Sequence, residues 1–396
     1  MNVLLLTHRL PYAPNRGDRI RAYHLVRALA QRHDVSLLSL VHDAEEASRA
    51  PEVGGVCIDY EAVLVPKMAN RLRGALGLAS HRPLTHALLS APGVEGALRR
   101  LVAARRPSVV VAYGTGMARY VFEPPLRDLP FVLDMVDVDS EKWREQAKRS
   151  RAPMRWVYAR ERRTLAAFEV HATTAAATTL VANERERLVM AGAAPDADVR
   201  VVPNGIDAAW FAPTGPPLPS STVVFTGVMN YAPNVEAVVW FVTRVWPLVL
   251  ARRPEARLVI VGASPGSAVQ ALAGAKVTVT GRVEDTRPFL WRAAVSVAPF
   301  LQARGIQNKV LEAVAAGLPT VITPVVSEGL PAEVMPAVRV ASSAEPFATA
   351  VVDMLALSPD DRRRVAGSAG LDGLTWTARL APLTDILSDA ARQPRR

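Results

Sequence analysis

The sequence predicts an α/β protein with two parallel-sheet domains, and three features of the chain lead to this prediction. Short apolar runs alternate with longer stretches of helical period, a pattern typical of strands joined by helical crossovers. At 396 residues, half of them apolar, the chain is too long for one ordinary core and apolar enough for two. A segment rich in proline and serine at residues 213–221 separates two similar halves and marks a linker.

In the first half, apolar runs predict strands and stretches of helical period predict helices. Strands are expected at residues 3–7, 35–41, 63–66, 108–113, 131–134 and 179–182, followed by a short strand from residue 199. Helices are expected at residues 18–31, 93–105 and 153–176. Because ligands of parallel sheets bind beyond the carboxyl ends of the strands, the loops after these strands are the first candidates for a site.

The second half repeats the pattern. Its strands are expected at residues 222–226, 257–261, 277–280, 295–299 and 320–323, with a helix at 235–250 and a terminal amphipathic helix at 374–390. We place the domain boundary within residues 195–221. The expected domains cover residues 1–200 and 201–375, and residues 376–396 form a C-terminal helix.

The stretch that begins at Arg304 has the composition of a phosphate-binding turn. It predicts a turn opening at Gly305, a short amphipathic helix capped by Asn308, and a stop at a Gly-Leu-Pro sequence. The first amides of such a helix, its positive dipole end, Arg304 and Lys309 would converge on a phosphate. Glu312, one turn later, suits two vicinal ribose hydroxyls. The alternative is an ordinary strand-to-helix turn with solvated charges.

The loop after the first strand contains Arg16, Gly17, Asp18 and Arg21. Gly17 allows the backbone to approach a ligand, Asp18 can cap the following helix, and the arginines supply positive charge. The sequence has no Gly-x-Gly-x-x-Gly after this strand, which argues against a dinucleotide dehydrogenase. It has no Gly-Lys-Ser/Thr phosphate loop either.

A second polar cluster follows the strand expected at residues 131–134 and contains Asp137 and Asp139. Alternating carboxylates could bind a cation, but an oxygen cage needs more ligands than this turn offers. A helix cap combined with one substrate contact is the better interpretation, and a purely structural cap is an equal alternative.

Two regions contribute most of the formal net charge of +10. Residues 67–106 and 141–163 are rich in arginine and lysine, and Trp143, Trp156 and Tyr158 are interleaved with the second set. Such surfaces suit an anionic bilayer, and a solvated basic face is the alternative. Nucleic acid is excluded as a partner because no recognised nucleic-acid module accompanies the charge.

The number of cysteines and the length of the apolar runs indicate the cellular compartment of the protein. The single cysteine, Cys57, excludes an internal disulfide and is expected in a core, which fits a reducing cytosol. The apolar run at residues 3–6 is far too short to span a bilayer, and no secretory leader is expected before it. We therefore expect a cytoplasmic protein, with docking on a membrane surface left open.

Seven segments together resemble a known family. They are residues 16–21, 137–143, 202–207, 225–227, 281–283, 305–319 and 327–330. On these segments the sequence resembles the retaining nucleotide-sugar glycosyltransferases of the GT-B fold, family four, and within them the sugar transferases associated with the exosortase/PEP-CTERM system. The resemblance spans nearly the whole chain, and its most specific parts are residues 204–207 and 305–317.

The resemblance implies two Rossmann-like parallel-sheet domains that face a central cleft, with the C-terminal helix crossing back to the N-terminal domain. Residues 1–200 would bind the acceptor, and residues 201–375 would bind a nucleoside diphosphate sugar as co-substrate, with no other cofactor and no metal. The acceptor would be a polyprenyl-linked glycan or an oligosaccharide in exopolysaccharide biosynthesis. The enzyme would be cytoplasmic and able to bind peripherally to the inner face of the cytoplasmic membrane.

The resemblance also implies roles for individual residues. Those expected at the donor are Gly227, Asn230, Arg282, Val283, Gly305, Asn308, Lys309 and Glu312. Those expected in catalysis are Lys309, Asp137 and Arg304. Those expected at the acceptor are Arg16, Gly17, Asp18, Arg21 and Asp139.

The sequence departs from the family pattern in three places. Arg304 stands where many members carry a first glutamate, and the turn after residues 222–226 lacks the usual Arg…Lys pair, so other cations must neutralise the diphosphate. The familiar histidine of the first domain is not found after residues 131–134, where Asp137 or Asp139 occupies its neighbourhood. Three rival functions remain: an epimerase of the same fold, a sugar-binding protein without catalysis, and a membrane-bound scaffold.

Overall fold

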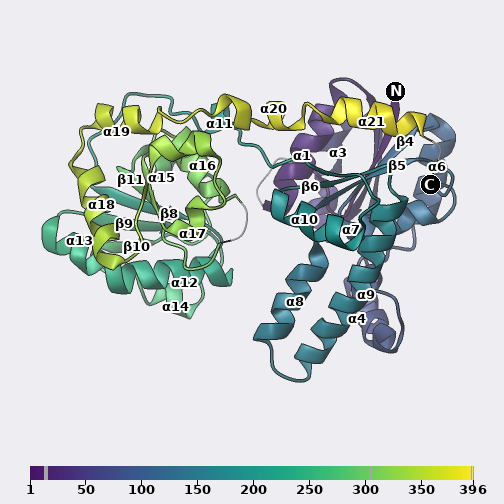
Figure 1. Ribbon diagram of the computed structural model, residues 1–396, viewed down its shortest axis with the longest axis horizontal. Coiled ribbons are helices and arrows are strands. Elements are labelled where there is room, and N and C mark those ends of the chain that lie inside the picture. The colour runs from purple at the N-terminus through teal and green to yellow at the C-terminus, as the bar shows by residue number, and fades with distance from the viewer. Residues whose placement is uncertain (13–16, 304–305, 394, 396) are drawn as a thin grey trace. The chain divides into compact units, whose positions relative to one another are not determined.

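The computed structural model describes residues 1–12, 17–303, 306–393 and 395 (Figure 1). The chain divides into two compact units. Unit 1 consists of Met1–Asn204 with Arg379–Arg396, and unit 2 consists of Gly205–Ala378. Each unit contains its own parallel sheet, so each folds around its own core.

Unit 1 contains, in the described residues, a seven-stranded sheet in the order β3-β2-β1-β4-β5-β6-β7 with parallel pairing throughout. The strands are β1 (Asn2–Thr7), β2 (Asp34–Val41), β3 (Asp59–Leu64), β4 (Val109–Tyr113), β5 (Phe131–Val136), β6 (Thr178–Val181) and β7 (Val199–Val201). The predicted parallel sheet is confirmed, but β3 begins four residues before the predicted start at residue 63. Its first residues are mostly polar and half-buried, so the apolar pattern does not reveal that they pair with β2.

The helices of unit 1 cover both faces of this sheet, as parallel sheets require. They are α1 (Gly17–Ala30), α2 (Ala44–Ser48), α3 (Ala50–Gly54), α4 (Lys67–Leu76), η1 (Gly77–Ala79), α5 (Leu84–Leu88), α6 (Val94–Arg105), α7 (Thr115–Ala118), η2 (Arg119–Phe122), α8 (Asp139–Arg149), α9 (Met154–Ala175) and α10 (Glu184–Ala193). α1, α6 and α9 confirm the predicted helices to within one residue at each end. Cys57 is buried as predicted, and burial raises its pKa to about 12.

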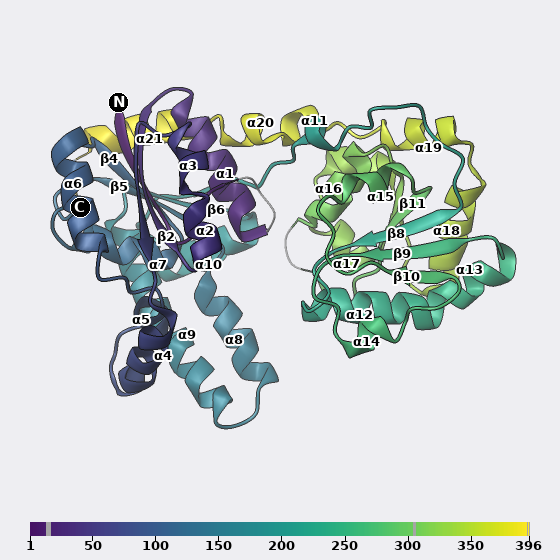
Figure 2. The ribbon, with the colours of Figure 1, turned by 180° about the vertical axis from the view of Figure 1, so that it is seen from behind.

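Four helices of unit 1 project from the sheet. α8 and α9 pack against each other, and α4 and α5 lie beside α9, as both ribbon views show (Figures 1 and 2). α4 belongs to the basic region at residues 67–106, and α8 and α9 belong to the basic region at residues 141–163. The first part of one basic region therefore meets the other in one projection, whereas α6, which carries three of the arginines of residues 67–106, packs against β2 and β3.

The C-terminal segment differs from the single helix expected at residues 374–390. It forms α20 (Trp376–Leu380) and α21 (Leu383–Arg392), with Pro382 at the N-cap of α21. Proline inside a helix removes a backbone hydrogen bond and clashes with the preceding turn, so one continuous helix is not formed. α21 buries its apolar side against β4 and β5 of unit 1.

Unit 2 contains, in the residues that the structure describes, a six-stranded parallel sheet in the order β10-β9-β8-β11-β12-β13. The strands are β8 (Thr222–Thr226), β9 (Arg257–Val261), β10 (Val277–Val279), β11 (Val295–Ala298), β12 (Thr320–Ile322) and β13 (Val338–Val340). β8 and β9 have the predicted bounds, and the next three strands end one residue early. The edge strand β13, in which two of three residues are exposed, was not predicted.

One long apolar helix crosses a face of this sheet. It runs continuously from Ala232 to Arg252 through α12 (Ala232–Trp240), the π-helical η3 (Phe241–Val245) and α13 (Trp246–Arg252). In the described residues it is the one helix long and apolar enough to cross a membrane, yet its inner side belongs to the core of unit 2. The other helices of unit 2 are α11 (Ala208–Phe211), α14 (Ser267–Gln270), α15 (Arg287–Trp291), α16 (Asn308–Ala315), α17 (Pro324–Ser327), η4 (Ala332–Ala337), α18 (Ala344–Ala356), α19 (Pro359–Ala366) and η5 (Asp372–Leu374).

Candidate functional site

The candidate site of unit 2 lies at the carboxyl edge of its sheet. The strand order reverses between β8 and β11, and ligands of open α/β sheets bind at such a switch point. Gly227 directly follows β8, and Lys309 lies in the first turn of α16, the helix that follows β11 in the chain. The site is therefore built from the segments after these two strands.

Two loops come into unusually close contact at this edge. The amide of Gly227 donates to the carbonyl of Val261 at 3.0 Å, and the amide of Met229 donates to the carbonyl of Ala263 at 2.8 Å. A Cβ at Gly262 would lie 1.7 Å from the carbonyl oxygen of Gly227. Position 262 therefore requires glycine, which lets the turns after β8 and β9 lie against each other.

Asn234 ties the turn after β8 to α16. Its Nδ2 donates to the carbonyl oxygen of Val228 at 2.8 Å, and its Oδ1 accepts from Nζ of Lys309 at 2.7 Å. A Cβ at Gly227 would lie 2.8 Å from this Nδ2 and 3.0 Å from this Nζ. A larger residue at position 227 would therefore displace both polar groups. Sequence reasoning missed Asn234 and Gly262, although Gly262 follows its apolar strand just as Gly227 follows β8.

Lys309 lies between two aromatic rings in partly buried surroundings. Its Nζ is 4.6 Å from the ring centroid of Phe225 and 4.4 Å from that of Phe300. Burial lowers the pKa of Lys309 to about 7, against the opposing effect of Glu312. Burial likewise raises the pKa of Glu312, against the opposing effect of Lys309. A bound anion would favour the charged ammonium, so this site can take up a proton together with an anionic ligand.

Other residues predicted at the donor lie along the same sheet edge. Asn230 in the turn after β8 and Arg282 in the turn after β10 are both exposed. Val283 is half-buried and packs against the small apolar cluster formed by β8, β9, α15 and α16. These positions are compatible with contact to a ligand at the edge.

The predicted capping role of Asn308 is wrong. Asn308 is the first residue of α16, and the N-cap is Gln307, which makes no side-chain capping bond. Oδ1 of Asn308 is instead buried without a hydrogen-bond partner in the described part of the chain. Arg304 and Gly305, which were predicted to act in catalysis and donor binding, lie outside the described residues.

Unit 1 has its own switch point, between β1 and β4. The ring of His8, after β1, stacks on that of Tyr113 at the end of β4, with centroids 5.6 Å apart. Gly114 follows with φ of +83°, and a Cβ there would lie 3.2 Å from Nδ1 of His8. These residues were not predicted from the sequence, although a glycine directly after a fully apolar strand was the available signal.

Arg21, predicted to bind the acceptor, has a structural role instead. It is 2% exposed, and its Nε lies 3.0 Å from Oδ2 of the fully buried Asp134 on β5. Its Nη1 donates to the carbonyl of Val202 at 2.8 Å and to Oδ1 of Asn204 at 3.1 Å. The guanidinium thus connects α1 and β5 to residues 202–204, which end the Met1–Asn204 part of unit 1.

Among the other residues predicted in the first loop, the structure corrects the capping position of Asp18. Arg16 lies outside the described residues. Gly17 and Asp18 are the first two residues of α1, so Asp18 does not occupy the predicted N-cap position. The neighbouring Arg19 is buried and pairs with Glu46 at 3.1 Å, which places the side chain of Arg19 in a structural network.

Asp137 and Asp139 follow β5 and share one cation. Nζ of Lys142 lies 3.1 Å from Asp137 and 2.9 Å from Asp139. Burial lowers the pKa of Lys142, but the two carboxylates more than offset this effect and raise it above its usual value. Val136 has φ of +68°, a strained conformation for a β-branched residue of the kind found at functional sites. No group of three metal-binding side chains is found here or elsewhere in the described residues.

The helix cap predicted for these aspartates is wrong. α8 begins at Asp139 after Val138, which supplies no side-chain cap. The amide of Val138 donates to Glu186 at 2.9 Å, and that of Ser140 donates to Glu169 at 3.1 Å. Burial raises the pKa of Glu169 to about 7, against the opposing hydrogen bonds from Ser140. Carboxylates from α9 and α10 therefore take the place of a local cap.

Comparisons with known proteins agree with this architecture. Residues 220–356 match the family model described as Glycosyl transferases group 1. The structure is similar to sucrose-phosphate synthase of Thermosynechococcus elongatus, with a TM-score of 0.67, 18% identity, and coverage of 97% of this chain and 98% of that chain. It is also similar to Anabaena HepE in complex with UDP, with a TM-score of 0.65, 13% identity, and coverage of 98% and 100%. No match was found among the curated protein sequences.

A third likeness completes the assignment of the fold. The Escherichia coli trehalose-6-phosphate structure bound with UDP-2-fluoro glucose gives a TM-score of 0.62 at 13% identity, covering 100% of both chains. Two Rossmann-like parallel-sheet units of this kind form the GT-B fold, which confirms the predicted fold class. The match to the model described as Glycosyl transferases group 1 lies within unit 2.

Proposed function

We propose that the chain is a glycosyltransferase that moves a sugar from a nucleoside diphosphate sugar to a glycan acceptor. The observation that carries this proposal is the arrangement of Gly227, Asn234 and Lys309 at the switch point of unit 2, inside the segment that matches glycosyl transferases group 1. A partly buried lysine of lowered pKa beside a tight glycine turn suits a diphosphate. Structural neighbours bound with UDP or UDP-2-fluoro glucose support this donor class.

In this proposal the donor lies along the carboxyl edge of the sheet of unit 2. Lys309 contacts the diphosphate together with the first amides of α16. Glu312 accepts hydrogen bonds from the ribose hydroxyls, and the turns at Gly227 and Arg282–Val283 line the phosphates and the base. These roles follow from the family resemblance and are compatible with the positions of the side chains.

The reaction that we propose breaks the bond between the anomeric carbon and a diphosphate oxygen and forms a bond between that carbon and the acceptor hydroxyl oxygen, with retention of configuration. The hydroxyl proton passes to the leaving diphosphate. Negative charge develops on the leaving diphosphate as the sugar becomes cation-like, so groups already aimed at the diphosphate stabilise the transition state. Lys309 and the positive end of α16 would perform this task without a metal. Asp137 or Asp139, beside the strained Val136, would orient the acceptor hydroxyl in unit 1.

The finer assignments rest on the sequence segments that resemble the family. We propose a family-four enzyme associated with the exosortase/PEP-CTERM system, acting in exopolysaccharide biosynthesis in the cytoplasm. Residues 1–200 would receive a polyprenyl-linked glycan, and residues 201–375 would hold the donor. An acceptor of this chemistry would be presented at a membrane surface.

Thermal shifts with UDP, GDP, ADP and CMP, each with and without a chelator, test the proposal. A nucleotide at about 100 times its dissociation constant adds roughly 2.7 kcal/mol to the free energy of unfolding, which a melting curve resolves. Stabilisation by a nucleoside diphosphate that survives chelation would support the proposal, and no shift with any nucleotide would refute it. Donor turnover with and without acceptor then separates a transferase from an epimerase.

A further inference from the structure

Helix α4 is packed through its polar side. Asn70 and Gly74, one turn apart, are its buried residues. Nδ2 of Asn70 donates to the carbonyl oxygens of Leu88 at 3.0 Å and Ser90 at 2.7 Å. A Cβ at Gly74 would lie 3.6 Å from the side chain of Leu88. An amide and a glycine therefore form the side of α4 that faces the protein.

The opposite side of α4 is apolar and exposed. Met68, Leu72 and Leu76 follow one another at intervals of four residues and so form one stripe, hereafter the α4 stripe. Their exposed fractions are 76%, 66% and 75%. Surface helices of globular proteins place the apolar stripe against the core, and α4 does the reverse. Apolar surface of this kind, rimmed by polar groups, marks an interaction site.

The α4 stripe has strongly basic surroundings. From Lys67 to Arg82 the chain contains four lysine or arginine residues and no aspartate or glutamate. By helical angle, Arg71 and Arg73 lie equally close to the stripe, one on each side, and Lys67 lies further around on the side of Arg71. Arg73 donates to Oδ1 of Asn70 at 3.2 Å, and Nζ of Lys67 lies 3.8 Å from Oδ2 of Asp43. Long basic side chains in these positions can reach an anionic layer while the stripe enters an apolar one.

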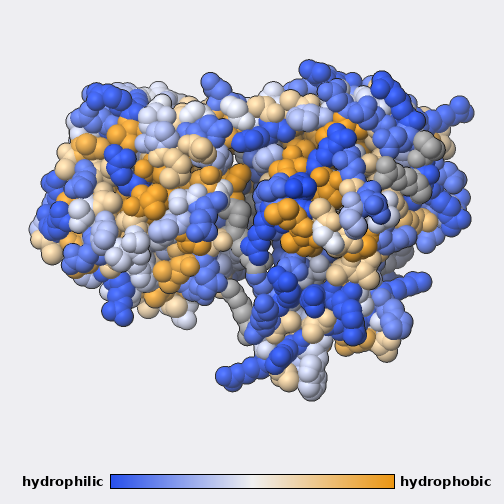
Figure 3. Space-filling model, viewed as in Figure 1, coloured by the Kyte–Doolittle hydropathy of each residue, from blue (hydrophilic) through white to orange (hydrophobic). Residues whose placement is uncertain are grey.

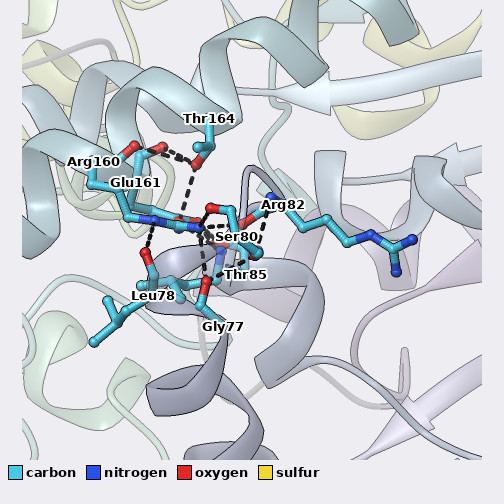
Figure 4. Close-up of polar contacts among 9 residues, drawn as sticks. Gly77, Leu78, Ser80, Arg82, Thr85, Arg160, Glu161 and Thr164 are labelled. Atoms are coloured by element: carbon cyan, nitrogen blue, oxygen red, sulfur yellow. Dashed lines mark hydrogen bonds and ion pairs between the residues drawn. The ribbon is translucent and has the colours of Figure 1, made fainter.

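Hydrogen bonds from α9 hold residues 77–85, the segment that follows α4 (Figure 4). These bonds keep the α4 stripe in one orientation on unit 1. The guanidinium of Arg160 donates to the carbonyl oxygens of Gly77 at 3.0 Å, Leu78 at 3.1 Å and Arg82 at 2.8 Å. The buried carboxylate of Glu161 accepts from the first two amides of α5, at 2.6 and 2.9 Å. The exposed stripe is therefore a built feature of unit 1 and not a loosely attached helix.

The start of α9 adds an aromatic side chain beside these hydrogen bonds. Trp156 precedes Arg160 by one turn, lies on the same side of α9 and is 70% exposed. Tryptophan is favoured at bilayer interfaces, because its ring is apolar and its N–H is polar. Hydrophilic side chains gather over the α8 and α9 projection (Figure 3), in agreement with its many cations.

We propose that the α4 stripe docks on an anionic lipid bilayer. Met68, Leu72 and Leu76 enter the boundary between headgroups and acyl chains, Lys67 and Arg71 lie at the lipid phosphates, and the cations of α8 and α9 add attraction over a wider area. A single stripe on a convex helix, framed by cations, fits a fluid anionic interface, whereas a protein partner would need a broader apolar contact. The contact needs neither nucleotide nor acceptor, so it stands apart from the proposed transfer reaction.

Co-sedimentation with lipid vesicles tests this proposal. The full chain is mixed, without nucleotide, with phosphatidylcholine vesicles that contain or lack about one third phosphatidylglycerol. The protein is expected to sediment with the anionic vesicles only, and the bound fraction is expected to fall as salt rises. The triple variant Met68→Ser, Leu72→Ser, Leu76→Ser is expected to partition at least about tenfold less, and Arg71→Gln about fivefold less.

The matched control is the triple variant Leu188→Ser, Leu218→Ser, Val340→Ser, at positions that are 59%, 53% and 45% exposed elsewhere on the surface. This control is expected to bind vesicles as the unchanged protein does, and both triples are expected to melt normally because all six residues are exposed. The proposal would be overturned if the unchanged protein did not bind anionic vesicles, or if the triple variant of the α4 stripe bound them as well as the unchanged protein. It would also be overturned if the stripe variant and the control variant lost vesicle binding to the same extent. A dimer that only the stripe triple dissociates would also overturn it, by assigning the stripe to a second copy.

Discussion

Nζ of Lys309 donates to Oδ1 of Asn234 at 2.7 Å, a bond between groups 75 residues apart in the chain. The bond holds the lysine beneath the turn at Gly227, where a Cβ would come within 3.0 Å of the ammonium. It thereby joins the start of α12 to the start of α16, the two helices that follow the strands at the switch point. The position of the main candidate cation is thus set by a tertiary contact.

Lys309→Ala is expected to lower turnover at least about tenfold, because it removes a charge-assisted contact to the leaving diphosphate. Lys276→Ala is the control, since Lys276 precedes β10 and so lies at the opposite end of that strand from the site. Initial rates with the donor selected by the nucleotide screen give the comparison. Normal turnover by Lys309→Ala would show that Lys309 does not contact the diphosphate.

Nucleotide affinity is expected to fall as pH rises above about 7. Burial lowers the pKa of Lys309 to about 7 in the empty site, and a bound diphosphate raises it. Between these two pKa values binding takes up a proton, so affinity falls by up to about tenfold per pH unit. Titration calorimetry with UDP at pH about 7 and about 9 measures the effect, and Lys309→Ala is expected to abolish it. An equal slope in that variant would assign the proton to another group.

Most strands of both sheets could be predicted because strands buried on both faces are nearly continuous apolar runs. β8 and β9 have the predicted bounds for this reason. The strands that were not predicted mix apolar with polar or exposed residues. An example is β13, which is exposed at Arg339 and Val340. Pro382 was a visible signal that the terminal helix is broken, and the amphipathic pattern on both sides of it concealed the break.

The site was less predictable, because its geometry comes from contacts between distant segments. The pattern around Lys309 indicated the helix and its cation, but not the bond to Asn234. The arginines of the first loop looked alike in the sequence, yet Arg21 is enclosed by partners from β5 and from residues 202–204. Local sequence shows which charges exist, and the fold decides which of them are already neutralised.

Glu312→Ala is expected to weaken UDP binding by about tenfold, because a hydrogen bond to a charged group contributes about 1.5–3 kcal/mol. The loss is expected for UDP and not for 2′,3′-dideoxy-UDP, which lacks the ribose hydroxyls. Glu333→Ala, at an exposed position of the same unit, is the control. Equal affinity of Glu312→Ala and the unchanged protein for UDP would reject the ribose role.

Gly262→Ala is expected to destabilise unit 2 by about 3 kcal/mol or more, because the new Cβ would overlap the carbonyl oxygen of Gly227. Gly266→Ala is the matched control from the same loop, where a Cβ would meet no atom within 4 Å. Chemical unfolding of both variants gives the two changes in the free energy of unfolding. Similar small losses in both variants would show that the two loops can move apart without cost.

Arg21→Met is expected to lower the free energy of unfolding by about 3–5 kcal/mol, because it leaves the carboxylate of Asp134 buried without its partner. The double variant Arg21→Met, Asp134→Leu is expected to recover much of this loss, since no charge remains buried. Urea unfolding of Arg21→Met, Asp134→Leu and the double variant gives the coupling energy between the two side chains. An acceptor-binding arginine would give a different result, in which Arg21→Met melts normally and loses only activity. The enclosed ion pair, with further bonds to Val202 and Asn204, favours the first outcome.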